Sequence, residues 1–259
     1  MKSPVYTGHP AFCCLDFPLS LVFKAKNSDH PSSKVGHYTI FWYTTGMYSA
    51  ILFDFDGTLA DTLDLYIKAY DIALKKFGFV FDSNEIVKKC FGKTEQDVCN
   101  DLGILNKTQE FRDSYYEAID KLFKNAELFE PTQSIVKYCH DKGLKVGIIT
   151  FGSRWYIDKM LEQFNIRSSF DIVISQSDVI KAKPDPEAVF VVCKRLNTDP
   201  VKTIVVGDSR SDILMGKAAG SKTVLVLYEK YKYFSDINSL TSSDPDFTIK
   251  SLDDLKRII

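Results

Sequence analysis

Short apolar runs recur along the chain from residue 51 onward, and most are apolar at consecutive positions rather than at every second one. The runs are 51–53, 146–149, 172–174, 203–206 and 223–227. A strand that is apolar on both faces is buried on both faces, as in a parallel sheet covered by helices. The segments expected to be helical are 132–140, 153–164, 186–196, 211–219 and, at the end, 252–259. The pattern predicts an α/β fold with helices on both faces of a parallel sheet.

Between the first strand and the others, the apolar period changes to that of helices. One stripe at three- and four-residue steps comprises Tyr66, Ala69, Tyr70, Ala73, Leu74 and Phe77, and another comprises Phe111, Tyr115, Ala118, Ile119, Leu122 and Phe123. Gly78 is expected to end the first of these helices. Asp82 with Glu85, and Thr94 with Asp97, have the spacing of capping boxes. Residues 62–130 are therefore predicted to be almost wholly helical, with aromatic side chains that pack between helices.

Residues 1–46 show neither period and are punctuated by proline, glycine and serine. From Met47 the pattern becomes regular and leads directly into the first strand. We predict that residues 1–46 are a poorly ordered N-terminal extension, or the product of a misplaced start codon. A chain that begins at Met47 is expected to keep its stability and activity.

Composition and charge narrow the classes of partner. With 33 basic and 34 acidic residues the net charge is −1, which provides no field to attract nucleic acid or an anionic membrane. No apolar run reaches the roughly 18 residues of a membrane span. The apolar segment 11–23 is interrupted by Asp16 and Pro18, and it lacks a convincing cleavage site for a secretory signal. Neither a nucleic-acid nor a membrane partner is expected.

The cysteines have no spacing typical of a metal site. They are Cys13, Cys14, Cys90, Cys99, Cys139 and Cys193. Scattered cysteines of this kind are expected to be reduced thiols in a cytoplasmic protein.

Two carboxylates end the first apolar run. Asp54 and Asp56 are separated by one residue, so alternation along an extended chain places them on the same side. Two unpaired anions would repel each other unless a cation lies between them. The economical interpretation is a hard, oxygen-liganded cation such as Mg²⁺, with one carboxylate left to attack a substrate and the other to move protons.

Other strand ends carry matching chemistry, because ligands of open parallel sheets bind at the carboxyl ends of strands. Thr150, Phe151, Gly152 and Ser153 offer a hydroxyl, loop amides and a helix start to a phosphate. Lys181 and Lys183 precede Pro184, and the segment 207–212 supplies Asp208 and Asp212. Each residue alone has a structural explanation as a cap, a strand end or a solvated side chain. Four strand ends that deliver such groups to one crevice are much harder to explain in this way.

The order of these motifs resembles that of the haloacid dehalogenase-like superfamily of phosphohydrolases. The motifs are Asp54-Phe55-Asp56-Gly57-Thr58-Leu59, Thr150, Lys183-Pro184 and Gly207-Asp208-Ser209-Arg210-Ser211-Asp212. The resemblance covers Met47 to the C-terminus and implies a Rossmann-like core at 47–61 and 131–259, with a helical cap domain inserted at 62–130. Glu130-Pro131-Thr132 stands where the family commonly has Pro-Gly, which is a minor departure.

The resemblance also implies roles for these residues. Asp54 would be the nucleophile, which forms an aspartyl-phosphate, and Asp56 the acid and base that protonates the leaving alcohol and activates water. Thr150, the amides of Phe151 and Gly152, and Lys183 would bind the phosphoryl group, and Lys183 matches the family position better than Lys181 does.

The same resemblance implies a metal site. Asp54, Asp208 and the backbone carbonyl of Asp56 would bind Mg²⁺, while Asp212 would bind the ion through water or orient Lys183. Gly57 permits a turn beside the site, and Thr58 is a candidate to fix it by a hydrogen bond.

The expected activity is hydrolysis of a small phosphorylated metabolite, either phosphoglycolate-like or a sugar phosphate, by a monomer or homodimer. Lys93, tethered by Gly92 at a helix start, is equally well interpreted as a ligand of a second anionic group or as a solvated turn residue. The alternative activity is that of a phosphomutase resembling β-phosphoglucomutase. Carbon–halogen hydrolysis is disfavoured because related dehalogenases lack the carboxylate of Asp56. A binding protein without catalysis is a remote alternative.

Overall fold

The structure is a computed structural model that describes residues 47–231 and 240–259. The expectations for residues 1–46, including the extension and the chain that begins at Met47, lie outside these described residues. The strands are β1 (Ala50–Phe53), β2 (Ala60–Asp61), β3 (Glu127–Leu128), β4 (Lys145–Ile149), β5 (Ile172–Ile174), β6 (Thr203–Gly207), β7 (Lys222–Val226) and β8 (Phe247–Ile249). The α-helices are α1 (Leu63–Lys76), α2 (Ser83–Cys90), α3 (Glu95–Asp101), α4 (Thr108–Leu122), α5 (Thr132–Asp141), α6 (Arg154–Gln163), α7 (Glu187–Leu196) and α8 (Arg210–Ala219).

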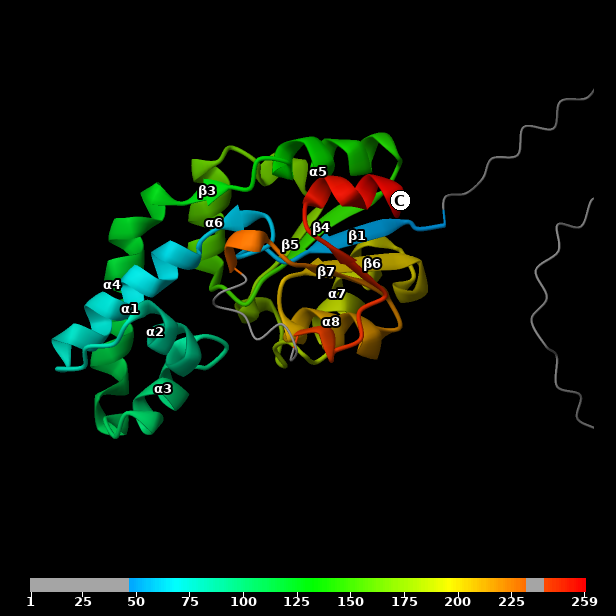
Figure 1. The fold of residues 1–259 in the computed structure, drawn as a ribbon. Coiled ribbons are helices and arrows are strands. Elements are labelled where there is room, and N and C mark those ends of the chain that lie inside the picture. The colour runs from blue at the N-terminus through cyan, green and yellow to red at the C-terminus, as the bar shows by residue number, and fades with distance from the viewer. Residues whose placement is uncertain (1–46, 232–239) are drawn as a thin grey trace, which may run out of the picture. The chain divides into compact units, whose positions relative to one another are not determined.

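Six strands form one parallel sheet in the order β5-β4-β1-β6-β7-β8 (Figure 1). Strand β1 lies in the interior, and its Phe53 is in register with Ile148 of β4 and Val206 of β6. From β1 the chain first builds one side of the sheet and then returns to build the other. This reversal places a crevice at the carboxyl ends of β1, β4 and β6, where open α/β sheets bind ligands. The predicted α/β fold with a parallel sheet is confirmed.

The two faces of the sheet pack into separate apolar clusters because successive side chains of a strand alternate. Leu52 packs with residues of α7 and α8 on one face. Ile51 and Phe53 pack on the other face with residues of α5, α6 and the 3₁₀ helix η7 (Leu252–Arg257). Figure 1 shows α5 and the C-terminal helix on one side of the sheet, and α7 and α8 on the other. Helices therefore cover both faces, as the continuous apolar strands predict.

The helices between β2 and β3 pack chiefly against one another. Tyr70 of α1 stacks on Tyr115 of α4 with ring centroids 4.4 Å apart. Both predicted capping boxes are confirmed: Asp82 with Glu85 opens α2, and Thr94 with Asp97 opens α3. The two ends of this helical segment lie side by side, because β2 pairs antiparallel with β3. The short β2–β3 ladder and the edge strand β8 are not predicted from the sequence.

Local details differ from the prediction at the C-terminus. Residues 252–259 are expected to form an α-helix, but the structure has the 3₁₀ helix η7 at Leu252–Arg257, opened by a capping box between Ser251 and Asp254. Two residues separate helix η7 from Ile249, the last residue of β8. Its Leu252 and Leu255 are fully buried. Residues three apart lie on the same side of a 3₁₀ helix, so this geometry turns both leucines to the buried side.

Two negative expectations bear on the described residues. Within residues 47–231 and 240–259, no helix has both the length and the apolar composition to cross a membrane. Cys90, Cys99, Cys139 and Cys193 are buried free thiols, whereas Cys13 and Cys14 lie outside the described part of the chain.

Candidate active site

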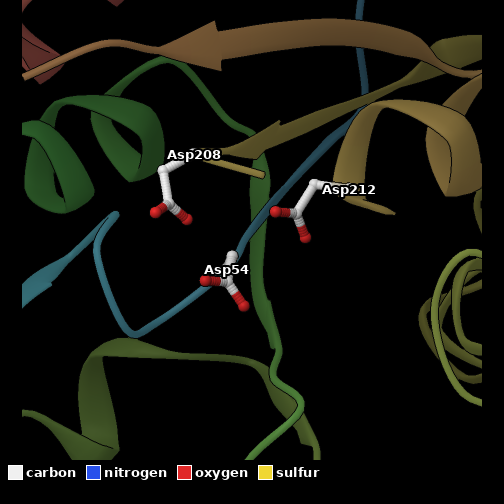
Figure 2. Close-up of side chains that lie close together, drawn as sticks. All are labelled: Asp54, Asp208 and Asp212. Atoms are coloured by element: carbon white, nitrogen blue, oxygen red, sulfur yellow. The ribbon is translucent and has the colours of Figure 1, made fainter. Parts of the chain in front are cut away.

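Three carboxylates meet at the carboxyl ends of β1 and β6. Asp54 directly follows β1, and its backbone N–H donates to the carbonyl of Val206 at 2.8 Å. Asp208 directly follows β6, and Asp212 lies in the first turn of α8. One oxygen of each of the three carboxylates lies within 4.8 Å of the others. Figure 2 shows the side chains of Asp208 and Asp212 directed towards Asp54.

Lys183 inserts its ammonium into this acidic cluster. Its Nζ donates to Oδ1 of Asp54 at 2.6 Å and to Oδ1 of Asp212 at 2.7 Å. The side chains of Lys183, Asp54 and Asp212 are 5%, 10% and 2% exposed, so both ion pairs are buried. Lys181, the other candidate, pairs instead with Asp185 at 3.5 Å and remains 70% exposed. The structure therefore brings Lys183, and not Lys181, to the carboxylates.

Asp212 has a partner at each oxygen. Its Oδ1 accepts from Lys183, and its Oδ2 accepts from the backbone N–H of Ser209 at 3.1 Å and from the Ser209 hydroxyl at 2.5 Å. The Ser209 contacts are a capping box at the start of α8. Asp212 thus holds Lys183 in place while it also caps the N-terminus of α8.

Two glycines allow the carboxylates to approach the backbone. Gly57 has a φ of +80°, and a Cβ there would lie 2.3 Å from Oδ2 of Asp208. A Cβ on Gly207 would lie 2.3 Å from Cγ of Asp212. Thr58, next to Gly57, donates from its hydroxyl to Oδ1 of Asp208 at 3.3 Å. The turn after Asp56 therefore both makes room for Asp208 and orients it.

The electrostatics of the cluster favour a cation. Burial, reinforced by Asp212 and Asp208, raises the pKa of Asp54 well above its ordinary value, although Lys183 opposes the rise. Burial and the neighbouring Asp212 raise the pKa of Asp208 to about 7. Burial alone lowers the pKa of Lys183, but Asp212 and Asp54 outweigh it and raise that pKa.

The donor set fits Mg²⁺. Three ionised carboxylates and one ammonium leave a net charge of −2 in a buried volume. All of the available ligand atoms are oxygens, which hard divalent cations prefer. A divalent cation would neutralise the negative charge that, together with burial, raises the pKa values of Asp54 and Asp208.

Asp56 faces a different set of partners. Its carboxylate is not a member of the Asp54–Asp208–Asp212 group, and its Oδ1 accepts from the hydroxyl of Tyr156 at 2.7 Å. Burial raises the pKa of Asp56, while hydrogen bonding to Tyr156, Thr62 and Tyr66 opposes the rise. Of the carboxylates predicted from the sequence, three therefore lie together and the fourth lies beside a group of hydroxyls.

The loop after β4 lies next to Lys183. Thr150, Phe151 and Lys183 line one small cavity. Thr150 is buried, and its hydroxyl accepts from the backbone N–H of Gly152 at 3.0 Å. Phe151 is 43% exposed. Thr150, Phe151 and Lys183, which are predicted to bind a phosphoryl group, are thus neighbours in the fold.

Lys93 has a separate environment among the helices. Its ammonium pairs with Asp101 at 2.8 Å, and it lines a surface hollow with residues of α2 and α3. No described contact joins it to the acidic cluster.

Sequence reasoning did not single out Tyr156. It lies 100 positions from Asp56 in the chain, within a segment that shows only the period of a helix. No local pattern signals such a contact.

Comparisons with known proteins give a consistent assignment. Residues 51–226 match the family model of the haloacid dehalogenase-like hydrolases. A putative pyrophosphatase PpaX from Clostridium perfringens is 30% identical over 204 residues, which cover 78% of this chain and 93% of the relative. A phosphoglycolate phosphatase from Aquifex aeolicus is 29% identical over 210 residues, which cover 78% of this chain and 96% of the relative.

Solved structures share the fold. The crystal structure of a predicted phosphoglycolate phosphatase from Haemophilus somnus superposes on this chain with a TM-score of 0.73 at 19% sequence identity. The superposition covers 83% of this chain and 99% of the Haemophilus somnus chain. With the family model spanning the first motif and the strands that carry Thr150 and Asp208, the chain belongs to the haloacid dehalogenase-like hydrolase family.

Proposed function

We propose that this protein is a Mg²⁺-dependent phosphatase that hydrolyses a small phosphorylated metabolite through an aspartyl-phosphate on Asp54. The observation that carries the proposal is the buried contact of Lys183 with Asp54, opposite Asp208, at the end of β1. One oxygen of Asp54 is held by an ammonium, so its other oxygen is free to attack phosphorus.

In the first step Asp54 attacks the phosphoryl group and the bond from phosphorus to the leaving oxygen breaks. Asp56 delivers its proton to that oxygen, which leaves as an alcohol. In the second step Asp56 takes a proton from water, which attacks the phosphorus and releases Asp54 and inorganic phosphate. The raised pKa of Asp56, caused by burial, suits a group that must both give and take a proton near neutral pH.

Lys183, Thr150 and the amides of Phe151 and Gly152 would supply the donors for the phosphoryl oxygens, and the Gly152 N–H would exchange its bond to the Thr150 hydroxyl for one to the phosphoryl group. Asp54, Asp208 and the backbone carbonyl of Asp56 would hold Mg²⁺, and Asp212 would orient Lys183 or bind the ion through water. When bound, the ion supplies positive charge that offsets the charge of the transferring phosphoryl group.

We further propose that residues 62–130 are a cap domain over a core formed by 47–61 and 131–259. The pairing of β2 with β3 supports these boundaries because it brings the entry and exit of the helical segment together. A substrate would have to fit between such a cap and the core, so the cap would select substrates by their leaving group. The curated relatives suggest inorganic pyrophosphate and phosphoglycolate as test substrates, beside sugar phosphates. A cytoplasmic location and a monomer or homodimer remain parts of the proposal.

The test is release of inorganic phosphate from a panel of these substrates with Mg²⁺, by the wild type beside Asp54→Asn. We expect turnover by the wild type, its loss in a chelator, its recovery with Mg²⁺, and no turnover by the folded variant. Retained activity in Asp54→Asn, or full activity after exhaustive chelation, would contradict the mechanism. A sugar monophosphate that is isomerised without release of phosphate would identify a phosphomutase instead.

A further inference from the structure

The strongest contact of Asp56 is with a phenol. Tyr156 donates its hydroxyl to Oδ1 of Asp56 at 2.7 Å, and the Tyr156 side chain is 3% exposed. Burial and the neighbouring Asp56 raise the pKa of Tyr156 well above its ordinary value, so the phenol keeps its proton and remains a donor. The bond is therefore a buried, directed contact on one oxygen of this carboxylate.

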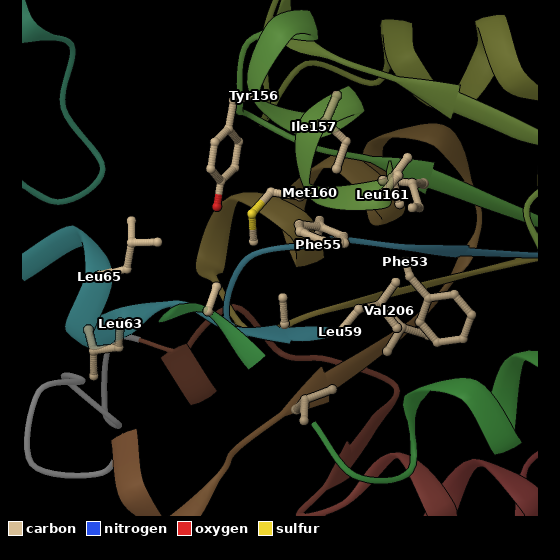
Figure 3. Packing of buried hydrophobic residues seen from close by; sticks show 14 of the residues in the cluster. Phe53, Phe55, Leu59, Leu63, Leu65, Tyr156, Ile157, Met160, Leu161 and Val206 are labelled. Carbon is tan, nitrogen blue, oxygen red and sulfur yellow. The ribbon is translucent and has the colours of Figure 1, made fainter. Parts of the chain in front are cut away.

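The ring of Tyr156 is itself held in place. Its helix, α6, begins at a Ser153 cap and is anchored in the core by Ile157, Met160 and Leu161. A Cβ on Gly152 would lie 2.9 Å from Cδ1 of Tyr156, so the loop after β4 leaves space for the ring. Figure 3 shows Tyr156 together with Ile157, Met160 and Leu161 in the buried apolar cluster.

Two phenols, those of Tyr156 and Tyr66, hydrogen-bond to the Asp56 carboxylate. Asp54, Asp208 and Asp212 gather within 4.8 Å, whereas the Asp56 carboxylate is outside that group. Tyr66 of α1 packs against Tyr156 with ring centroids 5.9 Å apart and adds a second phenol on this side. Asp56 thus meets phenols rather than the three carboxylates of the cluster that holds the nucleophile.

We propose that Tyr156 is a positioning residue that fixes the Asp56 carboxylate where its second oxygen faces the leaving group. This inference rests on the proposed function, because it concerns the proton that Asp56 delivers. Loss of the phenol would leave the nucleophile and the phosphoryl-binding groups intact while the acid becomes misplaced. Formation of the aspartyl-phosphate would be slowed for an ester whose leaving group needs that proton, but not for an ester whose leaving group departs as a stable anion. Hydrolysis of the aspartyl-phosphate, in which Asp56 activates water, is common to both esters.

The test compares Tyr156→Phe with wild type on two esters: the best alkyl phosphate of the substrate panel and p-nitrophenyl phosphate. Tyr231→Phe is the matched control, because the Tyr231 hydroxyl donates to Oδ1 of Asp61 at the same 2.7 Å but outside the acidic cluster. We compare kcat/KM, because it reports the steps up to departure of the leaving group and excludes the hydrolysis that both esters share. We expect Tyr156→Phe to lower kcat/KM about tenfold on the alkyl ester and less than about threefold on the aryl ester. Tyr231→Phe should leave both kcat/KM values within about twofold.

An equal loss on both esters, or the same selectivity in Tyr231→Phe, would overturn the proposal. Crystal structures of wild type and Tyr156→Phe provide a readout that needs no turnover. We expect Oδ1 of Asp56 to meet the phenol in the wild type and to take another orientation in the variant, and an unchanged Asp56 would overturn the proposal. If the wild type hydrolyses neither ester, the proposed function fails, and these structures alone decide the role of Tyr156.

Discussion

The ammonium of Lys183 lies 2.6 Å from Oδ1 of Asp54, and both side chains are buried. The same ammonium lies 2.7 Å from Asp212, so one cation compensates two anions from different elements. A buried charge that loses its partner is far more costly than an exposed one, because water cannot replace that partner. The stability of the metal-free site therefore depends on this lysine.

Replacement of Lys183 by methionine removes the charge and keeps a side chain of similar length. We expect Lys183→Met to lower the free energy of unfolding by about 3–5 kcal/mol in a chelator at neutral to basic pH. Urea unfolding provides the measurement. Lys181→Met is the control, since the exposed pair of Lys181 with Asp185 is worth less than about 1 kcal/mol. Equal decreases in the free energy of unfolding of the two variants would show that the buried ion pairs of Lys183 stabilise the fold no more than the exposed pair of Lys181 does.

Gly57 and Gly78 offer a matched pair of substitutions. Both have positive φ, +80° and +83°, so alanine brings similar backbone strain at each position, about 1 kcal/mol. A Cβ at Gly78 meets nothing within 4 Å, whereas one at Gly57 would lie 2.3 Å from Oδ2 of Asp208. We expect calorimetry to show that Gly57→Ala loses Mg²⁺ binding and that Gly78→Ala keeps it. The backbone strain lowers the free energy of unfolding by a similar amount in both variants. Mg²⁺ binding that survives in Gly57→Ala would contradict the close approach.

Much of the core could be predicted because its signals are local. Continuous apolar runs specify buried parallel strands, and the carboxyl ends of such strands meet at one edge. The sequence therefore predicts that Asp54 and Asp208 lie together, and the structure has an oxygen of each within 4.8 Å of the other. The choice of Lys183 over Lys181, made from its place before Pro184, agrees with the observed contacts to Asp54 and Asp212.

Other contacts could not be predicted because they join distant positions that have no signal of their own. Tyr156 has the appearance of an ordinary helix residue until α6 places it beside Asp56. The two-residue strands β2 and β3 are too short for any period, and only their pairing defines them. Sequence patterns show which residues are buried, but seldom which buried residues touch.

The pair of Lys93 with Asp101 predicts opposite changes in KM for phosphoglycolate when one or the other residue is replaced by alanine. The Lys93 ammonium pairs with Asp101 at 2.8 Å, so a substrate anion would have to displace that carboxylate. If Lys93 binds a second anionic group, Lys93→Ala should raise KM for phosphoglycolate severalfold, and Asp101→Ala should lower it by freeing the ammonium. KM for a sugar monophosphate, which has no anionic group besides its phosphate, should change in neither variant. Unchanged KM for phosphoglycolate in both variants would assign Lys93 to a solvated turn.

Asp208 links pH to stability. Burial and the neighbouring Asp212 raise its pKa from 3.8 to about 7 in the folded protein. The folded state therefore binds this proton more tightly than the unfolded state does. The corresponding contribution to stability is complete below about pH 4 and is lost as the pH rises through about 7.

Mg²⁺ should oppose that loss, because the ion and the proton compete for the same carboxylate oxygens. In a chelator, we expect the free energy of unfolding to fall between about pH 6 and pH 8. Saturating Mg²⁺ should raise it more at the higher pH, since binding to the folded state alone stabilises that state. Urea titrations with and without Mg²⁺ at both pH values measure the difference, and Asp208→Asn, which cannot ionise, is the control. An equal increment at the two pH values in the wild type would show that Asp208 carries no proton for the ion to displace.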